Sequence, residues 1–224
     1  MTVIGLDGFS KGWVAVSLDG DRRRIDFIDH VSRLAAQRFT RAGIDIPIGM
    51  TDTGDRACDR LARSALRPHG SRVFSGARRW LWEEFSTPAA ANVEAHRRGQ
   101  SRISLQLWHI GAKIMEVDGF VRSHRSLDLR EVHPELTFQR LNGGQPVPSK
   151  HTEEGLALRR DLLLREGFGE LDIWLSTTRI GTGAKRDDVL DACAVAVAAR
   201  DGAGSLPADE PPRDAHGLPM QIWF

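Results

Sequence analysis

The chain has 224 residues, of which 41% are hydrophobic and 27% charged, and a formal net charge of +1. This composition is ordinary for a folded protein, no apolar run is long enough to span a bilayer, and the two cysteines, Cys58 and Cys193, lack the spacing of a disulfide framework or a zinc site. Because the N-terminus has no features of a secretory signal, we expect a cytoplasmic protein with no membrane partner, folded as a single domain over 1–224.

The N-terminal part of the sequence predicts strands. Apolar runs at Val3–Asp7 and Trp13–Leu18, joined by a short glycine-flanked turn, indicate a β-hairpin, and Ile25–Ile28 follows as a third strand. Val31–Phe39 has helical periodicity, and the isoleucine-rich run Ala42–Met50 predicts a fourth strand. Hairpin strands followed by a helix and a buried strand indicate a mixed sheet, antiparallel at one edge and parallel beyond it.

The middle of the chain is mostly helical by its periodicity. We expect residues 54–118 to form a helical insertion within the domain, with a first helix that stops near Pro68 and a longer helix at Ser101–Val121. A fifth strand is expected at Leu129–Val132.

The C-terminal part predicts two further helices and a short strand. Thr152 opens an amphipathic helix with two glutamates in its first turn, and the alanine- and valine-rich stretch Asp187–Arg200 predicts a largely buried helix. The proline-rich residues 201–216 are expected to form a loose linker to a C-terminal strand.

Carboxylates recur in or beside these apolar elements, where an isolated ionised acid is costly. They are Asp7, Asp45, Glu135, Asp187, Asp188 and Asp191. A group of carboxylates that gathers in a fold repels itself unless cations neutralise it, and hard oxygen ligands suit Mg²⁺ or Mn²⁺. Two such ions about 4 Å apart can hold a phosphodiester and ionise the attacking water.

We expect Asp7, Asp45, Asp188 and Asp191 to be metal ligands and, with Glu135, catalytic residues. Asp188 and Asp191 share a helix face, and like charges at that spacing favour a bound cation, whereas Asp187 is expected to be the N-cap. Two of these residues have a second interpretation: Asp7 also suits the turn at Gly8, and Glu135 also suits the first turn of a helix that begins with Pro134.

Basic residues are concentrated in one region. Between Arg56 and Arg102 there are ten arginines and four acids, a net charge of +6, which is typical either of a surface that attracts polyanions or of a soluble helical face. The residues expected to bind substrate phosphates are Arg56, Arg63, Lys113, Lys150 and His133. Salt bridges to the acidic residues are the alternative for the cations, and a structural role is the alternative for His133.

Seven stretches, in order, are similar to the DUF429 family: "VIGLDGFSKGWVAV", "IDIPIGM", "RACDRLAR", "SLQLWHIGAKIMEVD", "EVHPEL", "SKHTEEGLALRRDLL" and "DDVLDACAVA". The resemblance covers nearly the whole chain and implies an α/β fold of the ribonuclease H-like type, with a mixed sheet flanked by helices. It also implies that the first-strand aspartate, the fourth-strand acid and the last-helix aspartate converge at the carboxyl ends of the strands.

We therefore expect a divalent-metal-dependent nuclease that hydrolyses phosphodiester bonds of DNA or RNA by a two-metal mechanism, with Mg²⁺ or Mn²⁺ as cofactor. One alternative is a relative of the actin-like ATPases and sugar kinases, because "LDGFSKG" is similar to their phosphate-binding hairpin. Another is a catalytically inactive nucleic-acid-binding protein of the same fold. The sequence leaves the oligomeric state open, since the closing "MQIWF" suits pairing within the chain or across a homodimer.

Overall fold

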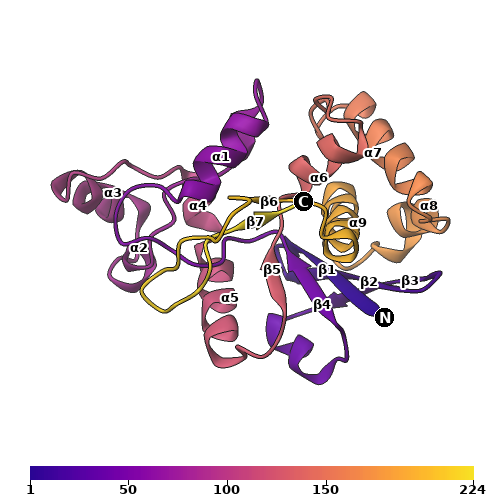
Figure 1. Ribbon diagram of the computed structural model, residues 1–224, viewed down its shortest axis with the longest axis horizontal. Helices are drawn as coiled ribbons and strands as arrows, with labels where there is room; N and C mark the ends of the chain where they lie inside the picture. The colour runs from indigo at the N-terminus through magenta and orange to yellow at the C-terminus, as the bar shows by residue number, and fades with distance from the viewer.

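A five-stranded mixed sheet forms the centre of the computed structural model, which describes residues 1–224 (Figure 1). β1 (Thr2–Phe9), β2 (Gly12–Asp19) and β3 (Arg22–Ile28) form an antiparallel meander, whereas β4 (Arg41–Ile44) runs parallel to β1 and β5 (Leu129–Glu131) runs parallel to β4. The strand order is β3-β2-β1-β4-β5. The α/β fold with a ribonuclease H-like mixed sheet, as predicted from the sequence, is therefore confirmed.

Helices cover both faces of the sheet. The segment between β4 and β5, where the sequence predicts a helical insertion, contains α1 (Ala57–Ala65), the 3₁₀ turn η2 (Gly70–Arg72), α2 (Trp80–Glu83), α3 (Pro88–Arg97), α4 (Leu105–His109) and α5 (Gly111–Ser123). The segment after β5 contains α6 (Pro134–Leu141), α7 (Glu153–Arg165), α8 (Leu171–Ile173), the π-helical turn η3 (Trp174–Thr178) and α9 (Arg186–Asp201). None of these helices is both long enough and apolar enough to cross a membrane.

Alternation along the strands separates two hydrophobic cores. Ile4 and Leu6 of β1 belong to the core that contains residues of α5, whereas Val3 and Phe9 belong to the core that contains most of α9. Because successive side chains of a strand point to opposite faces, the odd-numbered residues of β1 face α9. Asp7 is one of these residues, and this position determines which helix it meets.

Two helices differ from their predictions for local reasons. Val31–Phe39 forms only a 3₁₀ helix, η1 (Val31–Ala36), whose two buried residues, Val31 and Leu34, are three apart and so share a face in this tighter geometry. The long helix expected at Ser101–Val121 is divided into α4 and α5, because the backbone of Ile110 has ψ near 0° and caps α4. The next residue, Gly111, packs so closely against Trp82 that a Cβ would collide with the indole ring.

The fourth strand is shorter than predicted. β4 ends at Ile44, and the rest of the expected strand is irregular, because Pro47 has no N–H to donate and the backbone N–H of Ile48 bonds to the Glu131 carboxylate at 2.8 Å instead. Asp45 keeps one sheet hydrogen bond, from its N–H to the carbonyl of Leu6 at 2.9 Å. Asp45 therefore stands just beyond the carboxyl end of β4.

The C-terminal segment pairs with its own chain. β6 (Ser205–Leu206) and β7 (Ile222–Trp223) form a small antiparallel sheet, and Trp223 also forms a bridge with Val132. The region expected as a loose linker is held by the buried Asp214, which forms an ion pair with Arg79 at 2.8 Å and accepts a hydrogen bond from the N–H of Leu218 at 2.9 Å.

Candidate functional site

The register of two parallel strands brings Asp7 and Asp45 together. Leu6 of β1 is paired with Ile44 of β4, so the residues that follow them, Asp7 and Asp45, lie side by side at the same edge of the sheet. Parallel strands present their carboxyl ends at one edge, where the chain leaves the sheet and side chains can converge. The pairing register thus supplies the first two acids of the site.

Helix α9 brings the third acid to this edge. A Cβ on Gly5 would collide with the backbone of Ala192 and Ala196, so the helix lies directly on β1 at this glycine. Gly5 and Asp7 are on the same face of the strand, and Asp191 immediately precedes Ala192. The close contact between Gly5 and α9 therefore places Asp191 beside Asp7.

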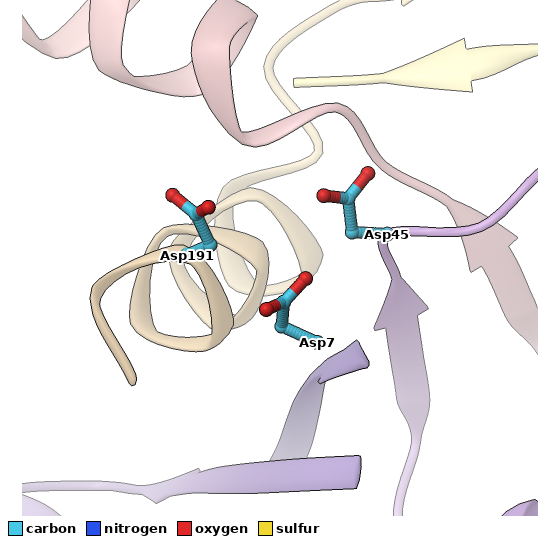
Figure 2. A group of neighbouring side chains, drawn as sticks. All are labelled: Asp7, Asp45 and Asp191. Atoms are coloured by element: carbon cyan, nitrogen blue, oxygen red, sulfur yellow. The ribbon is translucent and has the colours of Figure 1, made fainter. Parts of the chain in front are cut away.

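Asp7, Asp45 and Asp191 form a compact group of acids. One carboxylate oxygen from each residue lies within 4.8 Å of those of the other two, and Figure 2 shows the three side chains, from two strand ends and one helix, around a common space. Asp7 and Asp191 are buried and Asp45 is half-buried. The Oδ1 atom of Asp191 is buried without a hydrogen-bond partner. We call this group the acidic triad.

Burial raises the pKa of each member of the acidic triad, and repulsion from neighbouring acids adds to the effect. Burial raises the pKa of Asp7 well above its ordinary value, and the neighbouring charges of Asp45 and Asp191 add to this effect. Burial, followed by the charge of Asp191, raises the pKa of Asp45 to about 7. A divalent cation would relieve this repulsion, and an all-oxygen donor set with one unsatisfied buried oxygen fits Mg²⁺ or Mn²⁺.

Lys150 is the one cation in direct contact with the acidic triad. Its Nζ lies 2.6 Å from Oδ2 of Asp191 and 3.6 Å from Oδ2 of Asp187. Burial acts to lower the pKa of Lys150, but the charges of Asp191 and Asp7 outweigh it, so the net effect raises this pKa above its ordinary value. Lys150, predicted from the sequence to bind substrate phosphates, is thus an ion-pair partner of the acids.

The roles of the two aspartates at the start of α9 are the reverse of those expected for capping. The sequence predicts Asp187 as the N-cap, but the helix is capped at Lys185, and the carboxylate of Asp188 accepts the hydrogen bond from the Lys185 N–H at 2.7 Å. The prediction was wrong because the unpaired N–H groups of a first turn are within reach of the third helical residue as well as the cap. Asp188 lines the cleft described next, and burial raises its pKa to about 6.

A cleft of about 540 Å³ opens above the acidic triad. Its walls include five further residues that the sequence singled out: Arg56, Lys113, His133, Glu135 and Lys150. The Nζ of Lys113 donates a hydrogen bond to the carbonyl of Gly12 at 2.7 Å and lies over the ring of Trp13. Burial lowers the pKa of both Lys113 and His133, and the Nδ1 atom of His133 is buried without a partner.

Glu135 is held by arginines. One of its carboxylate oxygens accepts from Arg72 at 2.6 Å, and the other accepts from the fully buried Arg159 at 2.7 Å. Burial acts to raise the pKa of Glu135, but the two guanidinium groups lower it below its ordinary value. The residue also occupies the first turn of α6, the helix that begins with Pro134. Glu135 therefore faces the cleft with its charge neutralised by Arg72 and Arg159, and it is not a member of the acidic triad.

Arg56 is a buried structural cation in this structure. It is only 2% exposed and donates hydrogen bonds to Asp59. It also donates to both carboxylate oxygens of Glu131, and each of these two hydrogen bonds is 2.7 Å long. A guanidinium group that is saturated in this way has no donor left for a substrate phosphate. Arg63, in contrast, is exposed, donates to the carbonyl of Val73 at 2.8 Å and is not part of the cleft wall.

Several other arginines of the basic region are paired with acids as well. The ion pairs join Arg72 to Glu135, Arg79 to Asp118 and Asp214, Arg97 to Glu94, and Arg98 to Glu84 and Glu94. The excess positive charge of this stretch is therefore partly cancelled by acids from elsewhere in the chain.

Two acids and one arginine of the cleft were not predicted as site residues. Asp59 and Glu131 line the cleft and neutralise Arg56, and Arg72 lines it beside Glu135. The spacing of Arg56 and Asp59 on a helix, three residues apart, is a signal for the first of these pairs. The sequence carries no comparable signal for Glu131, which lies in β5, far along the chain from Arg56 at the start of α1.

The fold and the acidic triad define a mixed α/β protein with a carboxylate-lined cleft at the carboxyl ends of its parallel strands. The chain belongs to the family described as "Protein of unknown function (DUF429)", whose model matches residues 5–212. The match includes all three triad residues. Searches of curated proteins and of solved structures gave no match.

Proposed function

We propose that this protein is a divalent-metal-dependent phosphodiester hydrolase that acts on DNA or RNA. The observation that carries the proposal is the acidic triad: three carboxylates within 4.8 Å at the base of a cleft, with raised pKa values and one orphaned buried oxygen. A structural acid is normally paired with a cation or a hydrogen-bond donor, and a group of three acids in contact with a single lysine favours a functional site.

Asp7, Asp45 and Asp191 would hold the metal, and Mg²⁺ or Mn²⁺ is the class of ion that suits them. Such an ion, when bound, supplies a Lewis acid and lowers the pKa of a coordinated water. The chain's own contribution is to fix the three carboxylates on rigid elements, so that little reorganisation is needed when charge develops on a phosphate. Lys113 and Lys150, which line the same cleft, supply positive charge toward the anionic substrate.

Cleavage of labelled oligonucleotides tests this proposal. Single-stranded, duplex and DNA–RNA hybrid substrates are incubated with the full chain in Mg²⁺, in Mn²⁺ and in a chelator. We expect metal-dependent cleavage of at least one substrate and its loss, by about two orders of magnitude or more, in Asp7→Asn. The matched control is Asp52→Asn, which changes an exposed aspartate outside the cleft. Cleavage that survives in Asp7→Asn would show that the acidic triad does not carry the reaction.

The two alternatives expected from the sequence give different results in the same experiment. ATP hydrolysis without oligonucleotide cleavage would indicate a relative of the actin-like ATPases and sugar kinases. Binding of the oligonucleotides by the protein, without cleavage in the presence of Mg²⁺ or Mn²⁺, would indicate an inactive nucleic-acid-binding protein. Either result would overturn the hydrolase proposal.

A further inference from the structure

We propose that Lys150 takes the place of a second metal ion in this site, so that the acidic triad holds one divalent cation and not two. The inference rests on the proposed function, since it concerns the same acids. It replaces the two-ion arrangement expected from the sequence. Four observations carry it: the position of the ammonium group, the engagement of Asp188 by the start of α9, the rigidity of the loop that supplies Lys150, and the charge balance of the group.

The ammonium group occupies a cation position between two acids of α9. Asp187 and Asp191 are one helical turn apart, and the Nζ of Lys150 lies 3.6 Å from one carboxylate and 2.6 Å from the other. Lys150 bonds to Oδ2 of Asp191, which leaves Oδ1 buried and without a partner. The side chain of Asp191 therefore has one oxygen committed to Lys150 and one oxygen available for an ion shared with Asp7 and Asp45 (Figure 2).

The fourth acid near the triad is also engaged. A second ion would need ligands beyond the three oxygens of the acidic triad, and Asp188 is the nearest candidate along the helix. Its carboxylate accepts the hydrogen bond from the Lys185 backbone N–H, in the first turn of α9. A second ion would have to compete with this cap and with Lys150.

The loop that carries Lys150 is fixed from three sides. The carbonyl of Ser149 accepts hydrogen bonds from the backbone and the hydroxyl of Thr152, at 3.0 and 2.8 Å. Arg159 donates to the carbonyl of Pro148 at 2.8 Å, and Arg72 donates to that of Val147 at 2.9 Å. Helix α7 approaches this loop at Gly155, where a Cβ would collide with the backbone of Ser149. Lys150 is thus a preorganised cation, because its backbone is held in place.

The charges balance with one ion. With all three carboxylates ionised, as cation binding requires, the acidic triad and Lys150 together carry a charge of −2, which one divalent cation neutralises. This count leaves out the half-buried Asp187 and Asp188 in the first turn of α9. A second divalent cation would leave this buried group with an excess of two positive charges before any substrate binds, which is unfavourable in a partly desolvated site. Lys150 therefore supplies, as a permanent part of the chain, positive charge that a second ion would otherwise bring to the phosphate.

The number of bound ions tests the inference directly. The chelator-treated full chain is titrated with MnCl₂ alone, and binding is followed by calorimetry and by the electron paramagnetic resonance signal of free Mn²⁺. We expect one bound Mn²⁺ for the parent. Lys150→Met removes the charge and keeps an unbranched side chain, and we expect it to bind a second Mn²⁺ or to bind the first about tenfold more tightly. Lys150→Arg, which keeps the charge, and Lys185→Met, which removes an exposed lysine of the same region, are expected to match the parent.

The outcomes separate this inference from the function on which it rests. Two bound ions in the parent, or a Lys150→Met variant that binds Mn²⁺ as the parent does, would overturn the role of Lys150 and leave the hydrolase proposal standing. No bound ion in the parent would overturn both. Circular dichroism verifies that each variant is folded, and if Lys150→Met does not fold, the stoichiometry of the parent still decides between one ion and two.

Discussion

Replacement of Asp45 by asparagine should stabilise the metal-free protein, because the charge of Asp45 is partly removed from water and lies close to that of Asp191. Its pKa rises from 3.8 to about 7, first because the group is buried and then because Asp191 is close. Above about pH 7, the ionisation of Asp45 therefore lowers the free energy of unfolding by roughly 4 kcal/mol. Since Asp45 keeps part of its surface in water, we expect Asp45→Asn to increase the free energy of unfolding by about 2–4 kcal/mol at about pH 8.

The sign of the pH dependence follows from the raised pKa. Between its unfolded and folded pKa values, Asp45 binds more protons in the folded chain, so the stability of the parent falls as the pH rises from about 4 to about 7. The variant lacks this group. The stability difference should therefore be about 1 kcal/mol at about pH 5, should grow through neutral pH and should level off above about pH 7.

Urea denaturation in chelator, across this pH range, measures the difference. Asp52→Asn, which changes an exposed aspartate, is the matched control and should track the parent. Addition of Mn²⁺ should reverse the order, because the parent gains stability from binding and Asp45→Asn loses a ligand. A variant that is less stable than the parent at high pH without metal, or a stability difference that does not vary with pH, would show that the folded state does not raise the pKa of Asp45.

Three further results are expected. Mn²⁺ should raise the melting temperature of the parent more at about pH 8 than at about pH 6, since acids with raised pKa values must lose protons to bind a cation. An equal rise at both pH values would contradict metal binding by the acidic triad. Arg56→Met should lower the free energy of unfolding by about 3–5 kcal/mol, because it leaves two buried carboxylates without their cation. Arg63→Met, at an exposed position, should change this free energy by less than about 1 kcal/mol. Urea denaturation measures both, and equal losses in the two variants would contradict a buried role for Arg56. Gly5→Ala should destabilise the fold by several kcal/mol, because the added Cβ collides with the backbone of α9. The control Gly119→Ala, where a Cβ on α5 meets open space, should be neutral or stabilising by about 0.5–1 kcal/mol. A Gly5→Ala protein as stable as the parent would contradict the close packing of α9 on β1.

Much of the architecture could be predicted because it depends on local patterns. Alternation and short turns predicted the meander of the first three strands, and the alanine- and valine-rich run predicted the buried helix α9. The boundaries of the helices and strands were less predictable. The isoleucine-rich run after Ile44 has the composition of a strand, but the backbone N–H of Ile48 bonds to the carboxylate of Glu131, which lies far along the chain. Likewise, the periodicity of the α4–α5 region carries no sign of the contact between Gly111 and Trp82 that accompanies the break.

Residue type and periodicity are local properties of the chain, and they were enough to predict acids at the ends of apolar elements. The partners of those acids depend on how the elements pack in the fold. Asp188 and Asp191 lie three residues apart on one helix, and Asp188 accepts a hydrogen bond from the N–H of Lys185 in the first turn. Asp191 reaches Asp7 only because α9 packs on β1 at Gly5. Arg56 and Lys150 are both cations near acids, but one is enclosed by its partners and the other borders an unsatisfied oxygen. Ion pairing depends on distances between segments far apart in the chain, and packing alone sets those distances.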